Sequence, residues 1–126
     1  MNTFKRHTNL LADADSSAYD RVIKEAQKAK TDHWFDEMYA ELQLKMMRAA
    51  RRGKLTTTLQ LGGLAKRTEI SVGGALVKKL KSMGFSSHLS GPSLCIALIP
   101  VDKIIEIGTR EEVRRALHIK AGSDKV

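Results

Sequence analysis

The sequence predicts an α+β fold with a small, mostly antiparallel three-stranded sheet, and the spacing of its apolar residues carries that prediction. Residues 17–30 and 31–52 repeat apolar side chains with the period of a helix, which predicts two N-terminal helices. Residues 55–61 are rich in apolar and β-branched residues, 93–99 are nearly all apolar, and 85–90 precede the latter run across a Gly-Pro turn, which together predict three strands. A helical segment between the first and second strands, and a C-terminal helix, complete the order.

The length of 126 residues is that of one domain. The N-terminal residues show no hydrophobic periodicity, and the last residues, AGSDKV, are small and polar. We therefore expect a flexible N-terminal tail over residues 1–15, a single α+β domain over 16–120 and a flexible C-terminal tail over 121–126.

The two predicted N-terminal helices differ in their apolar faces. The second begins at a cap on Thr31 or Asp32, has a broader apolar face, and carries acids at its start and bases at its end, as the helix dipole favours. Gly53 supplies the left-handed residue that ends such a helix. The first has only a narrow apolar stripe, which requires a partner surface to cover it. The stripe consists of Tyr19, Val22, Ile23 and Ala26.

The three predicted strands include a hairpin. In residues 55–61, one side carries Leu55, Thr57, Leu59 and Leu61 and the other carries only polar residues, which is typical of a half-buried strand. Residues 85–90 and 93–99 flank the turn Gly91-Pro92, and the second of these runs is nearly all apolar. We therefore expect 93–99 to be the core strand, either central in the sheet or covered on both faces.

The segment 62–74 has two interpretations. In the first it is a flexible connection or clasp, and a helix capped by Ser71 then runs to Gly84. Gly73 and Gly74 would lie in the first turn of that helix, where a backbone or a phosphate can approach. In the alternative, the segment supplies the first half of a helix-turn-helix.

The alternative is supported by a resemblance. The stretches LAKRTEIS, GGALVKKLKSMGF and SSHLSGPSLCIALIP follow one another in this chain. They resemble the helix-turn-helix and β-wing of winged-helix DNA-binding domains. The resemblance implies a winged helix-turn-helix as the alternative fold, with LVKKLKSMGF in the place of the recognition helix.

The C-terminal part begins with an ambiguous stretch and ends in a helix. VDKIIEIG, from Val101, fits either a short strand or a helical turn. Thr109 and Glu112 have the spacing of a capping box, which predicts a final helix through about Ile119. Arg110, Arg114 and Arg115 are expected on its outer side.

The positive charge of the chain is concentrated in one stretch. Residues 48–81 hold nine basic residues and one acid, Glu69, and the rest of the chain is balanced, so this stretch accounts for the whole net charge of +8. A localised electropositive surface indicates a polyanionic partner. We expect the phosphate backbone of DNA or RNA to bind there with weak sequence preference. The predicted nucleic-acid-binding residues are Lys45, Arg48, Arg51, Arg52, Lys54, Lys66, Arg67, Lys78, Lys79 and Lys81.

Other function classes are less compatible with the sequence. The histidines and the single cysteine, Cys95, lack metal-ligand spacing, and neither a catalytic triad nor a nucleotide-binding loop is present, so we expect no enzyme, no metal and no cofactor. Cys95 lies in an apolar run and is expected to be a small core residue. A lone cysteine and the absence of a membrane-length apolar run predict a cytoplasmic protein without membrane association.

A partner of another class is also open. Residues 13–41 hold eight acids and four bases, so the basic stretch could pair with an acidic protein surface, including that of a second copy in a homodimer. The order of Ala49 to Gly53, Leu55 to Leu61, Lys81 to Phe85 and Leu94 to Ile99 resembles small α/β proteins of tailed bacteriophages. That resemblance implies a phage-encoded regulator, a virion component or an inhibitor of a host protein as possible roles.

Overall fold

The computed structural model describes residues 16–124, which divide into two compact units, one up to His33 and the other from Trp34. The predicted N-terminal tail, residues 1–15, lies outside the described residues, as do the last two residues of the predicted C-terminal tail. Among the described residues the fold is α+β, with four helices and one three-stranded antiparallel sheet.

The first helix, α2, runs without a break over Ser16–Arg51, where the sequence predicted two helices. A cap at Thr31 or Asp32 was the basis of that division, but α2 contains no glycine or proline, so no residue in it ends the helix. Gly53 ends it as predicted, with φ of 72°. In the first unit, Tyr19 and Val22 of the predicted apolar stripe are 62% and 42% exposed.

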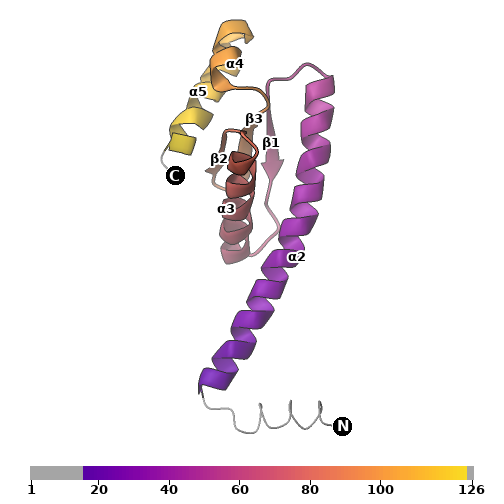
Figure 1. Ribbon diagram of the computed structural model, residues 1–126, viewed down its shortest axis with the longest axis vertical. Helices are drawn as coiled ribbons and strands as arrows, with labels where there is room; N and C mark the ends of the chain where they lie inside the picture. Colours follow the sequence, from indigo (N-terminus) through magenta and orange to yellow (C-terminus); the bar gives the residue numbers. More distant parts are fainter. Residues whose placement is uncertain (1–15, 125–126) are drawn as a thin grey trace. The chain divides into compact units, whose positions relative to one another are not determined.

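The second unit is built around the sheet, whose strands are β1 (Thr56–Gln60), β2 (Ser87–Ser90) and β3 (Ser93–Ala97). The strand order is β1-β3-β2, so the apolar strand β3 is central, as its sequence predicted. β1 and β2 are both antiparallel to β3 and both lie at an edge. Residues 34–51 of α2 lie on the β1 side of the sheet in Figure 1.

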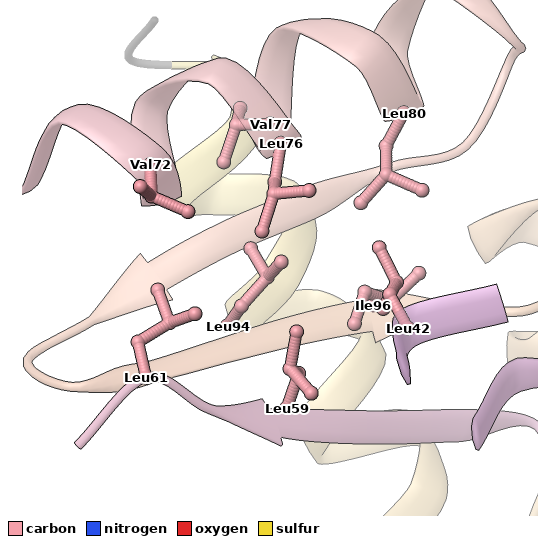
Figure 2. Close-up of a cluster of buried hydrophobic side chains, with 9 residues drawn as sticks. All are labelled: Leu42, Leu59, Leu61, Val72, Leu76, Val77, Leu80, Leu94 and Ile96. Carbon is pink, nitrogen blue, oxygen red and sulfur yellow. The ribbon is translucent and has the colours of Figure 1, made fainter. Parts of the chain in front are cut away.

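Helix α3 (Lys66–Ser82) covers one face of the sheet. Figure 2 shows its buried side chains directed at leucines of β1 and β3 and of the turn after β1, with Leu42 of α2 at the same core. At Gly73, a Cβ would come within 2.7 Å of a Leu89 methyl group, so the missing side chain lets α3 approach β2 closely. This core consists of Leu42, Leu59, Leu61, Val72, Leu76, Val77, Leu80, Leu94 and Ile96.

The start of α3 corrects the interpretation of residues 62–74. The helix begins at Lys66 rather than at Ser71, and Ala65 at its N-cap makes no side-chain capping bond, so no capping residue marked the start in the sequence. Gly73 and Gly74 therefore lie inside the helix, where their N–H groups serve the helix itself and offer no phosphate site. Because 66–82 is one uninterrupted helix, the helix-turn-helix alternative is wrong.

Helix α5 (Arg110–Asp124) covers the other face, and α4 (Val101–Ile107) packs mainly against α5. The ambiguous stretch after Pro100 is thus helical. The predicted capping box is confirmed, because Thr109 N–H donates to Glu112 Oε1 (2.9 Å) and Glu112 N–H donates to Thr109 Oγ1 (3.2 Å). This second core consists of Ala97, Val101, Ile104, Ala116 and Ile119, with Leu55, Cys95 and Ile99 packed against it.

Helix α5 continues to Asp124, through residues that the sequence assigned to a flexible tail. Gly122 is typical of a helix end, but here it is buried inside the helix. A Cβ at Gly122 would overlap the ring of His88 on β2. The glycine therefore serves the close packing of α5 on β2, which sequence periodicity does not reveal.

Candidate functional site

The outer edge of β1 carries backbone groups that the sheet does not use. Leu61 N–H donates to the carbonyl of Pro92 (2.7 Å), which fixes the odd-numbered residues of β1 as those bonded to the neighbouring chain segment. Successive residues of an antiparallel strand direct their backbone groups to opposite sides. The N–H and C=O groups of Thr56, Thr58 and Gln60 therefore point away from β3, toward the open edge.

A lysine of α2 meets this edge. Lys45 Nζ donates a hydrogen bond to the carbonyl oxygen of Thr58 (3.2 Å). The bond ties the second half of α2 to β1 and brings a cation to the strand, which is a common way of protecting an edge from pairing with another strand. The N–H groups of β1 that point away from β3 lie next to this cation.

Four of the predicted cations converge next to this edge. They line a hollow of about 370 Å³ between the end of α2 and β1, which we call the edge groove. Arg48 and Arg52 lie one helical turn apart, and Lys54 follows on the connection to β1. The edge groove is lined by Lys45, Arg48, Ala49, Arg52, Lys54, Thr57 and Thr58.

Two further hollows adjoin the same strand on the side of α5. One, of about 520 Å³, is lined by β1 and the residues before it, together with Glu112 and Arg115. The other, of about 340 Å³, lies between the sheet and α5, and we call it the α5 cavity. All three hollows share Thr57 and Thr58, so they are arranged around one strand. The α5 cavity is lined by Thr56, Thr57, Thr58, Cys95, Arg114, Arg115, His118 and Ile119.

The α5 cavity exists because α5 crosses the sheet off centre. The helix packs mainly on β2 and less closely on β3 and β1, so the face of β1 is only partly covered. His88 of β2 and His118 of α5 meet there edge to face, with ring centroids 5.2 Å apart. The space left over β1 and β3 opens between exposed arginines of α5.

The charges around β1 are mostly positive and mostly uncompensated. Arg115 is paired with Glu111 (2.8 Å) in an exposed ion pair, and Glu112 is engaged in the helix cap. Over residues 16–124, none of the ten predicted cations forms an ion pair with a carboxylate. Exposed pairs such as Arg115–Glu111 are weak, about 0–1 kcal/mol, so a phosphate can compete for the guanidinium.

The remaining predicted cations lie apart from this strand's hollows. Arg51 is exposed on α2 and lines none of the three. Lys79 lies over the Tyr39 ring, 5.8 Å from its centroid, a cation–π contact on the other face of the sheet. The other cations of α3, which are exposed and also line none of the three hollows, are Lys66, Arg67, Lys78 and Lys81. Four of the ten cations thus lie at the β1 edge and five on α3, and Arg51 of α2 belongs to neither group.

Arg114 and Arg115 line the site, whereas their place in the sequence predicted only that they lie on the outer side of the last helix. No spacing in the sequence links them to Arg48 or Lys54, because the contact arises from the way α5 folds back over the sheet. The one signal in the sequence is their position on the polar face of an amphipathic helix, which every surface helix shares.

Cys95 lies at the base of the α5 cavity as a neutral thiol. Burial raises its pKa above the ordinary value, an effect that the nearby Arg115 only partly offsets. Because the thiolate is the reactive form, this environment disfavours a nucleophilic role. Among residues 16–124, no three metal-ligating side chains lie close enough together to hold a metal ion.

The comparisons with known proteins add no identification. The chain matches none of the protein-family models, none of the curated proteins and none of the solved structures at a significant level. Within the described part of the chain, no helix combines the length and the apolar character that crossing a membrane requires.

Proposed function

We propose that the protein binds nucleic acid through phosphate contacts along β1, with weak sequence preference. The observation that carries the proposal is the edge groove, where Lys45, Arg48, Arg52 and Lys54 converge beside a strand edge without carboxylate partners. Binding of this kind gains free energy by releasing the counterions that surround the phosphates.

The geometry supplies two kinds of donor to a phosphate oxygen. The cations provide charge, and the outward N–H groups of Thr56 and Gln60 provide uncharged donors of the sort that position nucleic-acid backbones on proteins. Threonine side chains of β1 add hydroxyl donors in the same place. None of these groups distinguishes one base from another, and we therefore expect little sequence preference.

The test is the salt dependence of binding. A protein in which Arg48 and Arg52 are both changed to alanine should bind random single-stranded and duplex DNA more weakly. The slope of log K against log salt should become less steep by about 1.4 to 1.8 units, given about 0.7 to 0.9 per phosphate contact. The measurement is fluorescence anisotropy at several salt concentrations.

The matched control removes the same charge from α3. Changing Lys78 and Lys81 to alanine lowers the net charge equally but leaves the edge groove intact. We expect the salt slope of this control to stay close to that of the unchanged protein. An equal loss of slope in both variants would show that total charge, and not the edge groove, determines binding.

A second candidate function is the binding of an acidic protein segment. The edge of β1 favours it, because an extended peptide that displaces Lys45 from the Thr58 carbonyl can add to this edge as a further strand, and the surrounding cations suit acidic side chains. The partner could be a second copy, through the acidic region 13–41. Two results would favour this candidate. The protein would show no binding to nucleic acid near 0.1 M salt, and sedimentation would detect a dimer whose amount rises with protein concentration. A role as a phage regulator stays a prediction under either function.

A further inference from the structure

The α5 cavity has a different chemistry from the edge groove. Its base is apolar and uncharged, formed by the buried Ile119, the neutral thiol of Cys95 and the methyl groups of threonines. Its volume of about 340 Å³ falls in the usual range of small-ligand pockets, about 300 to 1,000 Å³. The lining therefore suits an uncharged, largely apolar group.

The rim of the cavity has polar groups at defined places. Thr56 and Thr58 face it from β1 with hydroxyls that both donate and accept hydrogen bonds. His118 offers a ring for stacking, and Arg114 offers a planar cation that forms no ion pair with a carboxylate among residues 16–124. A flat group with polar edges satisfies this arrangement better than an aliphatic chain does.

The cavity and the edge groove lie on either side of the same strand. Both are lined by Thr57 and Thr58, so the two hollows adjoin along β1. A polymer with negative charges and flat, uncharged groups at regular intervals matches both hollows. A nucleic-acid duplex matches only the edge groove, since its bases are stacked inside.

We propose that the α5 cavity receives an unstacked base of a single-stranded nucleic acid whose phosphates lie in the edge groove. The inference rests on the proposed function and adds a preference for single strands over duplexes. Base contacts with a side-chain platform of this kind contribute without reading the sequence, because every base has a flat face.

The first experiment uses the unchanged protein, in which Cys95 is the only cysteine. Alkylation of the thiol by N-ethylmaleimide is followed by mass spectrometry at mildly alkaline pH. Three probes are compared, each at about ten times its own Kd: a short oligo(dT), the same strand paired with oligo(dA), and an abasic oligonucleotide of the same length. We expect oligo(dT) to slow alkylation about ten-fold, since only the unbound tenth reacts.

The other two probes separate the base from the backbone. The duplex and the abasic strand carry phosphates but present no free base, so we expect both to bind and to leave the alkylation rate almost unchanged. Equal protection by the abasic strand, or no protection by bound oligo(dT), would overturn the inference and leave phosphate-led binding intact. If anisotropy detects no binding of any probe, the proposed function fails and the inference fails with it.

A second experiment fills the cavity. Changing Cys95 to leucine places a larger apolar side chain at its base, and changing it to serine serves as the control that keeps the space open. We expect the leucine variant to lose roughly ten-fold in affinity for oligo(dT), within the usual 1–3 kcal/mol per stacked base, and to bind the duplex as before. An unchanged ratio of single-strand to duplex affinity in a folded leucine variant would contradict the inference.

Discussion

Ser87 on β2 has a buried hydroxyl that makes no hydrogen bond within the described part of the chain. The residue is 2% exposed, and among the described residues its Oγ has no hydrogen-bond partner. A buried hydroxyl in that state lowers stability, because folding removes its water without replacing the lost hydrogen bond. The hydroxyl lies on a strand that packs between α3 and α5, and no polar side chain of the described residues reaches the hydroxyl there.

The change Ser87→Ala should therefore raise the free energy of unfolding by about 1 kcal/mol, measured by urea denaturation. Ser93→Ala is the matched control on the neighbouring strand, where the hydroxyl donates to Gln60 Oε1 (3.1 Å) at a partly exposed position. We expect that control to change stability by less than about 0.5 kcal/mol. A loss of stability in Ser87→Ala would mean that the hydroxyl has a partner after all.

Within α3, two neighbouring glycines have opposite roles. A Cβ at Gly73 would lie 2.7 and 2.9 Å from the two methyl carbons of Leu89, whereas a Cβ at Gly74 has no atom of another segment within 4 Å. Gly74→Ala should raise the free energy of unfolding by about 1 kcal/mol, the usual gain for alanine over glycine in a helix. Gly73→Ala should lose this gain and lower stability by about 1 kcal/mol through overpacking.

Thermal or urea unfolding of the two variants, side by side, decides the point. Each variant is the control for the other, because the substitution, the helix and nearly the position are the same. If Gly73→Ala were as stabilising as Gly74→Ala, the close approach of α3 to β2 would not be a constraint on the fold.

The start of α5 makes stability depend on pH through Glu112. Hydrogen bonds from Thr109, above all from its backbone N–H, hold the pKa of this carboxyl below its ordinary value. A carboxyl with a lowered pKa in the folded state stabilises the protein above its unfolded-state pKa, and this contribution is lost as pH falls through the folded-state pKa. We expect Glu112→Gln, which keeps a weaker cap, to be less stable than the unchanged protein at pH 7.

The same difference should vanish in acid. Once the pH falls below the lowered pKa of Glu112 in the folded state, the carboxyl is protonated and is a neutral acceptor like the amide. Unfolding free energies of the two proteins measured from pH 7 to pH 3 should converge. A difference that is constant over this range would show that the charge of Glu112 has no part in the cap.

At the scale of elements, the sequence was sufficient wherever a local rule decides the structure. The capping box at Thr109, the helix end at Gly53 and the hairpin around Gly91 depend on neighbours in the chain, and all three are confirmed. The start of α3 and the end of α5 depend on packing against distant strands. In the sequence, Gly122 suggests a helix end. In the structure, the glycine is explained by the ring of His88, which occupies the space of its missing side chain.

At the scale of the whole molecule, the sequence predicted that the positive charge lies mostly in one stretch of the chain. It did not predict where on the folded surface the cations come together. Four of the ten cations meet beside β1, and the five on α3 lie elsewhere because that helix covers one face of the sheet. Arg114 and Arg115 reach β1 from the end of the chain, through the fold of α5. Charge spacing along a sequence cannot show such a meeting, because it depends on how α5 packs back on the sheet.

The central claim is that nucleic acid lies along the open edge of β1, and amide chemical shifts test it most directly. Random-sequence single-stranded DNA is titrated into isotope-labelled protein at low salt. We predict that the largest shifts fall on Thr56, Thr58 and Gln60 of β1 and on Arg114 and Arg115 of α5, with small changes over α3. Two results would contradict this claim. Either the shifts are concentrated on residues 66–82, or no shifts appear at concentrations where anisotropy reports binding of both duplex and single-stranded DNA.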